Sequence, residues 1–252
     1  MTPTDTSGAS ESPPTRFATT AWSVVLRAAD QDAGVRRPAL AELCRSYWYP
    51  LYAFARKRGV PAADVEDLVQ GFFTHLIEGD ALRYADHRRG RFRGFIVAAF
   101  QQFQARRHEY ESAAKRSPPG HLVPIDVVAG EARYSKELAA PGHPDRSFEY
   151  AWAVTVLQRA LDRLRVEYEA EGRLDRFEAL RGFVTGVNVL EYAALAPLLG
   201  GSAGAARVAA HRFRQRYAAL VREEVGATLD DGESVEVEIG ELLAAVRLGP
   251  SS

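Results

Sequence analysis

Apolar residues recur at helical spacing along most of this chain. Residues 61–80, PAADVEDLVQGFFTHLIEGD, place them at i, i+3 and i+4: Val65, Leu68, Val69, Phe72, Phe73, Leu76 and Ile77. This spacing gathers the residues on one side of an α-helix, whereas the alternation that a strand requires is scarce here. The sequence therefore predicts an all-α fold, in which these residues are first of all a packing face.

Proline and glycine indicate where the helices stop. The stretch 37–59, RPALAELCRSYWYPLYAFARKRG, is predicted to be helical up to Gly59, with a kink or a boundary at Pro50. Five prolines fall within residues 117–147 and predict a linker between two small helical domains, 17–116 and 148–225. Residues 1–16 are rich in Ser, Thr and Pro and predict a disordered tail, and residues 226–252 form an acidic C-terminal extension.

Composition narrows the classes of function. The chain has 252 residues, of which 46% are hydrophobic, enough for a substantial core. Its single cysteine, Cys44, permits no internal disulfide and is expected to be a small buried hydrophobe in a cytoplasmic protein. We expect a soluble protein without a membrane partner, since no run approaches the ~18 apolar residues of a membrane span. HExxH, GxGxxG and GxxxxGK[ST] motifs are absent, so we expect no catalytic residues, no metal and no cofactor.

The formal net charge is −1, but acidic and basic residues are concentrated in separate segments of the chain. Residues 62–86 carry six acids and one arginine, whereas residues 87–116 carry eight basic residues and two acids. The pattern repeats near the end, where residues 205–222 carry five arginines and no acid, and residues 226–252 carry six acids and one arginine. Neighbouring segments therefore suit partners of opposite charge.

The strongest local motif is residues 191–225, EYAALAPLLGGSAGAARVAAHRFRQRYAALVREEV. A short apolar helix ends at Gly200 and Gly201, Ser202 can cap the next helix, and that helix is basic, which is the layout of a DNA-binding helix-turn-helix. On a helical wheel the predicted packing face is Ala206, Ala210, Phe213, Tyr217, Leu220 and Val221. The opposite face holds Arg207, His211, Arg212, Gln215 and Arg222.

This basic face suits a DNA major groove, with Arg207 and His211 leading and other arginines on phosphates. The alternative is a solvated helix face. Pro197 lies inside the preceding helix and should cost about 3 kcal/mol unless it falls in a distorted last turn.

A second basic helix is predicted in residues 88–107, RRGRFRGFIVAAFQQFQARR. Its wheel places Phe92, Phe95, Ile96, Ala99, Phe103 and Tyr110 on one face. Arg93, Gln101, Gln104 and His108 lie on another, and Arg88, Arg89 and Arg91 precede the helix. Arginine and glutamine beside aromatic rings suit single-stranded DNA, and a plain surface helix is the equal alternative.

In combination, the segments TTAWSVVLRA, YWYPLYAFARKRG, EDLVQGFF and RGRFRGF, followed by the helix-turn-helix, resemble RNA polymerase sigma factors of the extracytoplasmic-function type. The resemblance runs from about residue 17 to residue 225. It implies a first domain that binds the clamp helices of the polymerase beta-prime subunit and the melted minus-ten promoter element. It also implies a second domain that reads the minus-thirty-five element, and it leaves room for an anti-sigma or other regulatory protein as partner.

The resemblance assigns residues to three contacts. The core-polymerase contact is Asp64, Asp67, Leu68, Gln70 and Phe73. The minus-ten contact is Arg88, Arg89, Arg91, Arg93, Gln101, Gln102, Gln104, Arg106 and Arg107. The minus-thirty-five contact is Ser202, Arg207, His211, Arg212, Arg214, Gln215 and Arg216.

The chain departs from the family pattern in both DNA-binding helices. Gln102 and Arg106 stand where many relatives have Asn and Asp, which shifts the expected minus-ten preference. SAGAAR at 202–207 replaces a frequent SEGTVK, so that an acidic residue is lost at Ala203.

Two other interpretations remain open: a helix-turn-helix DNA-binding regulator that does not engage polymerase, and a protein that binds only other proteins. The acidic extension, 226–252, either folds back over the basic helix 203–224 or packs against the side of its domain.

Overall fold

A computed structural model describes residues 27, 28, 30, 32–78, 82, 91–106, 127–138, 141–226, 229 and 234–250. Every regular element within these residues is helical, which confirms the all-α prediction for this part of the chain. The elements are α2 (Ala33–Lys57), α3 (Ala62–Glu78), α4 (Phe92–Ala105), α6 (Val127–Glu137), α7 (Pro144–Ala170), α8 (Leu174–Leu180), α9 (Gly182–Thr185), α10 (Tyr192–Leu199), α11 (Ala203–Gly226) and α12 (Val235–Leu248). The predicted tail, 1–16, and most of the TTAWSVVLRA segment lie outside the described residues.

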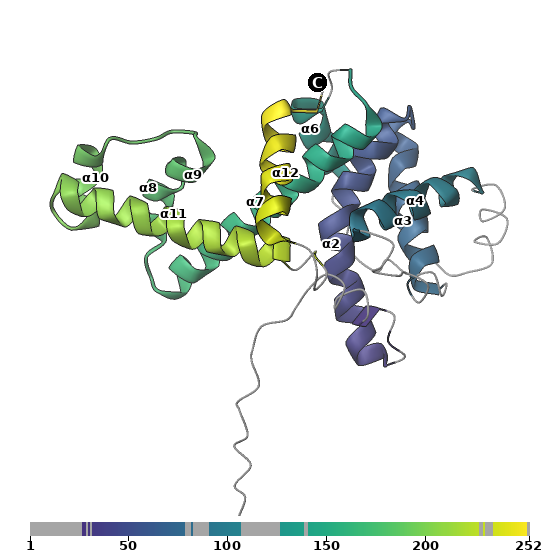
Figure 1. The fold of residues 1–252 in the computed structure, drawn as a ribbon, viewed down its shortest axis with the longest axis horizontal. Coiled ribbons are helices and arrows are strands. Elements are labelled where there is room, and N and C mark those ends of the chain that lie inside the picture. The colour runs from purple at the N-terminus through teal and green to yellow at the C-terminus, as the bar shows by residue number, and fades with distance from the viewer. Residues whose placement is uncertain are drawn as a thin grey trace, which may run out of the picture.

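The helices form two lobes joined by two long helices (Figure 1). One lobe holds α2, α3, α4, α6 and the start of α7, and the other holds α8, α9, α10 and the start of α11. α7 and α11 pack against each other between them, and at 1.5 Å per residue the 27 residues of α7 reach about 40 Å. α12 stands against α7 and the end of α11.

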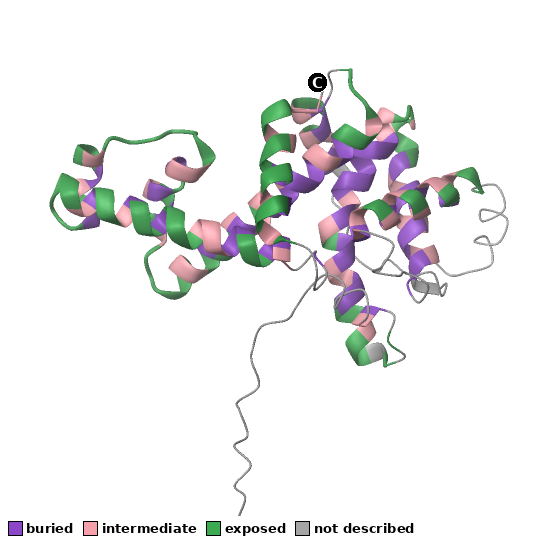
Figure 2. Ribbon diagram, viewed as in Figure 1, coloured by how far each residue is buried: buried purple, intermediate pink, exposed green. Residues whose placement is uncertain are grey.

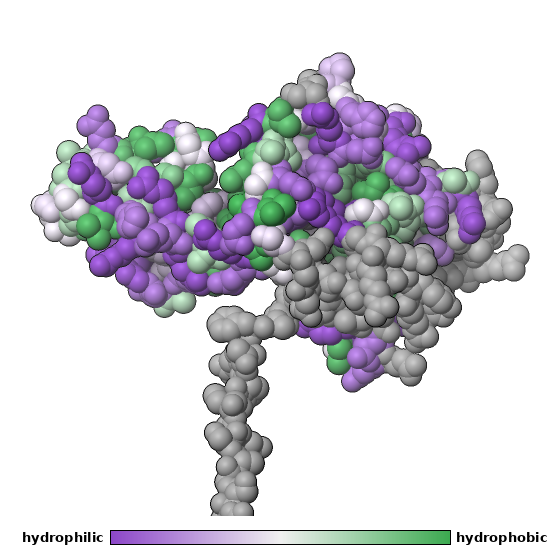
Figure 3. Space-filling model, viewed as in Figure 1, coloured by the Kyte–Doolittle hydropathy of each residue, from purple (hydrophilic) through white to green (hydrophobic). Residues whose placement is uncertain are grey.

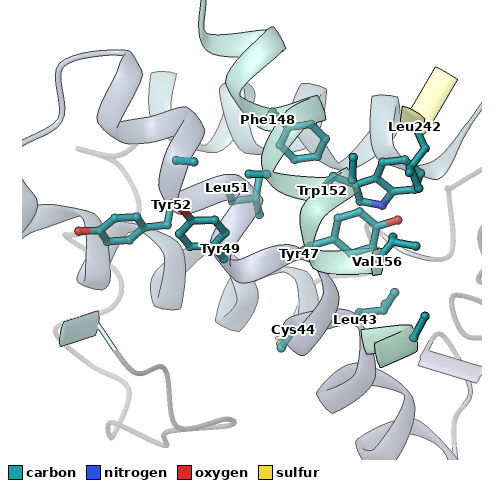
Figure 4. Close-up of a cluster of buried hydrophobic side chains, with 14 of the residues drawn as sticks. Leu43, Cys44, Tyr47, Tyr49, Leu51, Tyr52, Phe148, Trp152, Val156 and Leu242 are labelled. Atoms are coloured by element: carbon teal, nitrogen blue, oxygen red, sulfur yellow. The ribbon is translucent and has the colours of Figure 1, made fainter. Parts of the chain in front are cut away.

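The core of the first lobe lies between α2 and α7. Tyr47 and Leu51 of α2 point toward Phe148 and Trp152 of α7, and all four side chains are buried (Figure 4). Figure 2 shows buried residues gathered in the centre of this lobe. Aromatic rings of helices about a hundred residues apart in sequence thus meet in this core.

α2 continues through Pro50, where the sequence predicted a kink or a boundary. The helix begins at an aspartate cap, in which the Asp32 carboxylate accepts a hydrogen bond from the Gly34 amide at 2.8 Å. The side chains next to the proline, Tyr49 and Leu51, are both buried. The prediction of a boundary was wrong because this packing offsets the backbone hydrogen bond that Pro50 cannot make.

The predicted packing face of α3 is confirmed for six of its seven residues, and the side chain of Ile77 lies outside the described part. Its buried residues are Val65, Leu68, Val69, Phe72, Phe73 and Leu76. Phe72 meets Phe100 of α4 edge to face, with ring centroids 5.1 Å apart, and Phe103 stacks on His75 at 5.6 Å. α4 is thus fixed on α3 by aromatic contacts.

The segment predicted as a linker, 117–147, contains a docked helix. α6 lies within it, and α7 begins at Pro144, before the predicted domain start at residue 148. The Arg56 side chain donates to Glu131 at 3.1 and 3.2 Å, and Arg133 lies over the Tyr49 ring at 3.8 Å. The prolines signalled a break in periodicity, but long-range polar and aromatic contacts attach this part of the segment to α2. Residues 107–126 and 139–140 lie outside the described part.

The second lobe is built around Phe213 of α11, whose ring lies 5.6 Å from Tyr168 and 5.8 Å from Phe177. Pro197 lies in the last turn of the eight-residue helix α10, the place where a proline was expected to cost least. Within the described residues, no single helix has the length and hydrophobicity to cross a membrane, and α10 with α11 reaches that threshold only as a pair bent by 87°.

Candidate nucleic-acid interface

A glycine turn sets α11 nearly at right angles to α10. Gly200 and Gly201 have φ of 118° and 81°, which side chains with a Cβ rarely adopt. The Ser202 hydroxyl oxygen accepts a hydrogen bond from the Ala205 amide at 3.1 Å, so the predicted cap is present. The two helix axes bend by 87°, close to the ~90–120° of helix-turn-helix pairs.

The buried face of α11 matches the predicted one. Ala206, Ala210, Phe213, Leu220 and Val221 are buried. Tyr217 is half-buried and donates its hydroxyl to the Leu157 carbonyl of α7 at 3.1 Å. The packing of α11 on α7 and α10 therefore decides which of its residues face solvent.

The opposite face of α11 is exposed and basic. Its exposed polar residues are Arg207, His211, Arg212, Arg214, Gln215 and Arg222. The Arg207 guanidinium lies over the Tyr192 ring at 5.5 Å, and the Arg214 guanidinium over the Phe183 ring at 5.9 Å. Because these rings are partly buried in the lobe, they hold the two cations in place while leaving them exposed to a ligand.

Arg216 differs from the other predicted minus-thirty-five residues. Its Nε donates to Glu167 of α7 at 2.9 Å, and its Nη1 donates to Glu223 at 3.3 Å. The hydrogen bond from Arg216 lowers the pKa of Glu167 below its ordinary value. Arg216 therefore attaches α11 to α7, and its charge is already neutralised.

Apolar residues flank this basic face. Val187, Val189 and Leu190, which connect α9 to α10, are 62%, 53% and 47% exposed. An open pocket beside them is lined by Phe183, Leu190 and Tyr192. Figure 3 shows hydrophobic atoms along the upper edge of this lobe and hydrophilic atoms below them.

α4 presents only part of its predicted polar surface. Gln102 and Arg106 are exposed, whereas Gln101 and Gln104 are half-buried. The buried apolar residues are Phe92, Ile96, Phe100 and Phe103, so Phe100 joins the predicted face while Phe95 is only half-buried. Three predicted minus-ten residues, Arg88, Arg89 and Arg107, lie outside the described residues.

Arg91 and Arg93, at the start of α4, are held by carboxylates of α12. Arg91 donates to Glu241 at 3.0 Å and meets Glu238 at 3.1 Å, and Arg93 contacts both of these carboxylates. Reasoning from the sequence missed these partners. The signal was present in the opposite charges of the two segments, but sequence alone did not show which basic helix the acidic extension would reach.

The described helix of the acidic extension, α12, does not cover the basic face of α11. α12 packs on α7 and on the end of α11, with Leu242 beside Trp152 (Figure 4), and Arg207, His211 and Arg222 stay exposed. Of the two alternatives, packing against the side of the domain is the one observed. Folding of α12 back over the basic face was wrong, because the apolar residues of α12 pack against α7 and the end of α11.

Only some residues of the predicted polymerase contact are exposed. Asp64 and Asp67 are exposed on α3, and Gln70 donates to Glu66 at 3.0 Å. Leu68 and Phe73 are 3% and 5% exposed and belong to the core. A partner cannot reach them in this structure, so the accessible part of the predicted contact is Asp64, Asp67 and Gln70.

No family model, curated protein or solved structure matches this chain. Within the described residues, no group of three or more His, Cys, Asp or Glu side chains is arranged to hold a metal ion. The candidate functional surfaces are therefore those of α3, α4, α11 and α12.

Proposed function

We propose that this protein is an RNA polymerase sigma factor, which binds core polymerase through α3 and directs transcription initiation through α4 and α11. The observation that carries the proposal is the exposed basic face of α11, which follows a right-angle glycine turn. A helix of this kind fits a major groove, where arginines contact guanine edges and phosphates.

Two further observations support the proposal. The exposed carboxylates of Asp64 and Asp67 give α3 an acidic surface for a protein partner, in the lobe away from α11. α7 and α11 connect that lobe to the helix-turn-helix through packed side chains. One molecule can thus hold a protein partner at one lobe and duplex DNA at the other.

In this proposal the protein supplies recognition and strand capture, and the polymerase supplies the chemistry. Arg207 and His211, near the start of α11, contact bases at the minus-thirty-five element. Arg212, Arg214 and Arg222 neutralise phosphates, and Gln102 and Arg106 of α4 face the melted minus-ten strand.

The first experiment tests polymerase binding. Pull-down of core polymerase by the full chain is expected for the native protein and is lost in Asp67→Arg, because the substitution reverses an exposed charge of the acidic surface. Asp175→Arg makes the same change on α8, where the residue is also exposed, and should keep binding. No binding by the native chain would reject the sigma-factor proposal.

The second experiment tests promoter recognition. The promoter is found by in vitro transcription of genomic DNA with reconstituted holoenzyme, followed by mapping of start sites. Arg212→Ala with Arg222→Ala should weaken holoenzyme binding and reduce the slope of log K against log salt by about 2, because each removes one phosphate contact. Arg165→Ala, an exposed arginine of α7, is the matched control.

The same measurements separate the rival function. Sequence-specific binding of duplex DNA without polymerase binding would indicate a helix-turn-helix regulator. Equal binding of the holoenzyme to all sequences would indicate that α11 serves a protein contact.

A further inference from the structure

The start of α4 is enclosed by three carboxylates from two other helices. Each guanidinium nitrogen of Arg93 meets one of them: Nε lies 3.2 Å from Glu149 of α7, Nη2 lies 3.0 Å from Glu241 of α12, and Nη1 contacts Glu238 of α12. Arg91 adds contacts to Glu238 and Glu241. The cluster thus joins α4 to a helix about 145 residues further along the chain.

Burial makes this cluster more than a surface ion pair. The Glu238 side chain is 2% exposed and that of Arg93 is 10% exposed. The Arg93 guanidinium also lies 4.7 Å from the centre of the Trp152 ring. A buried carboxylate needs cationic partners, so Glu238 binds the two arginines more persistently than an exposed glutamate does.

The same contacts leave these arginines unable to bind a phosphate. A guanidinium binds one carboxylate or phosphate through its paired N–H groups, and those of Arg93 are already directed at glutamates. Three carboxylates surround two guanidiniums, so the formal charge of the cluster is −1 and it repels a nucleic-acid backbone.

We propose that α12 is an internal competitor of single-stranded nucleic acid, whose Glu238 and Glu241 occupy the two α4 arginines that a strand must use. The identity of the strand as the melted minus-ten element rests on the function proposed above. In the free protein α12 masks Arg91 and Arg93, and promoter capture displaces it.

The attachment of α12 is suited to such a role. Leu242 is buried beside Trp152, whereas Val237, Leu243 and Leu248 on the same helix are 58%, 41% and 56% exposed. α12 is therefore held by one apolar face, of which only Leu242 is fully buried while Val235, Ile239 and Val246 are partly buried, and by the carboxylates. A strand that replaces the carboxylates removes the polar part of this attachment.

The test compares two glutamates of α12 in the full chain. Glu241→Gln removes a carboxylate from the cluster, and Glu236→Gln makes the same charge change at an exposed position of the same helix. Binding of a fluorescent oligo-dT probe, measured by anisotropy, should tighten by about threefold to tenfold for Glu241→Gln only. The gain should vanish when Arg91→Ala is added, because the cation that Glu241 occupies is then missing.

A second pair tests the same mask without a change in charge. Leu242→Ala weakens the docking of α12, and Leu243→Ala truncates an exposed leucine next to it. Only the first should tighten oligo-dT binding, with thermal unfolding used to verify that both variants remain folded. Equal affinities within both pairs would overturn the proposal.

The outcomes separate this inference from the proposed function. Core polymerase binding together with equal affinities within both pairs rejects the mask and leaves the sigma factor. A gain for Glu241→Gln without polymerase binding rejects the sigma factor and leaves α12 as a mask of single-strand binding.

Discussion

Arginines in this protein have three distinct environments. Arg207 lies over an aromatic ring and faces solvent, Arg216 joins α11 to α7 through Glu167, and Arg93 is enclosed by glutamates. A cation that already has a carboxylate partner gains little from a phosphate, whereas one held by a ring keeps its full charge for a ligand. The electrostatic role of each residue is therefore set by its neighbours.

Cys44 is expected to be chemically inert in the folded protein. It is 3% exposed, and burial raises the pKa of its thiol to about 12. At pH 8 only about one thiol in ten thousand is then ionised, and the thiolate is the reactive form. Ellman's reagent should label the native protein far more slowly than the urea-unfolded protein. Prompt stoichiometric labelling under native conditions would contradict the burial.

The pH dependence of stability should report the contact between Glu241 and Arg91. The hydrogen bond from Arg91, followed by the charges of Arg91 and Arg93, lowers the pKa of Glu241. Its stabilising effect is therefore present above the ordinary pKa of about 4.3 and is lost as the pH falls through the lower folded value.

We expect the urea midpoint of the native protein to fall more steeply than that of Glu241→Gln as the pH drops from about 5 to about 3. Burial raises the pKa of neighbouring Glu149, and the charge of Glu241 adds to that rise, so Glu149 gives the opposite slope and reduces the difference between the two proteins. Glu241 is half exposed, so added salt should shrink the difference. Parallel curves at low salt would show that the contact contributes nothing to folding.

At the scale of elements, the short helix α6 is attached to α2 at a point where its backbone lies very close to a tryptophan ring. Gly130 of α6 packs against Trp48 of α2, and a Cβ at this position would lie 2.9 Å from the indole ring. Tyr52 and Arg56 then bind Glu131 next to it. Helix docking here depends on the absence of a single methyl group.

Gly130→Ala should therefore cost about 1–3 kcal/mol in the free energy of unfolding, because the indole or α6 must shift. Gly240→Ala in α12 is the matched control, since no described neighbour comes within 4 Å of where its Cβ would stand and its backbone is helical. The control should gain about 0.5–1 kcal/mol through the helix propensity of alanine. Urea unfolding measures both, and a stabilising Gly130→Ala would show that the ring moves aside freely.

At the scale of the molecule, α7 belongs to both lobes. Its first half packs on α2 through Phe148 and Trp152, and its second half contributes Tyr168 to the aromatic cluster around Phe213. Between these, Glu224 of α11 binds Arg159 and Arg163 of α7, both at 2.9 Å. Loss of packing in the second lobe is thus expected to destabilise α7 and, through it, the first lobe.

Phe213→Ala tests this coupling. Removing the ring should cost about 3–5 kcal/mol in the free energy of unfolding, since it empties the centre of an aromatic cluster. Val208→Ala truncates a residue of the same helix that is 49% exposed and should change stability by less than about 0.5 kcal/mol. A small loss for Phe213→Ala, measured by urea unfolding, would show that the lobe repacks around the cavity.

Much of the fold, and half of the site, could be predicted from local pattern. Periodicity placed Phe213 inside and Arg207 outside, and the glycines with Ser202 predicted the turn. These features depend on residues within a few positions of one another, which sequence order records directly. Contact assignments taken from the family resemblance were less secure, because Leu68 and Phe73 are core residues of α3.

The sequence by itself determined most of the helical segments and the packing face of α11, and it showed that acidic and basic segments suit partners of opposite charge. Only the tertiary structure decided which of them met. The acidic residues of α12 bind the arginines of α4 and not those of α11, because Leu242 packs beside Trp152. α6 packs on α2 within the segment that its prolines had predicted to be a linker. Helical periodicity depends on residues a few positions apart, which the sequence shows directly. The pairing of distant charges depends on how the helices pack, because packing of the core brings those charges together.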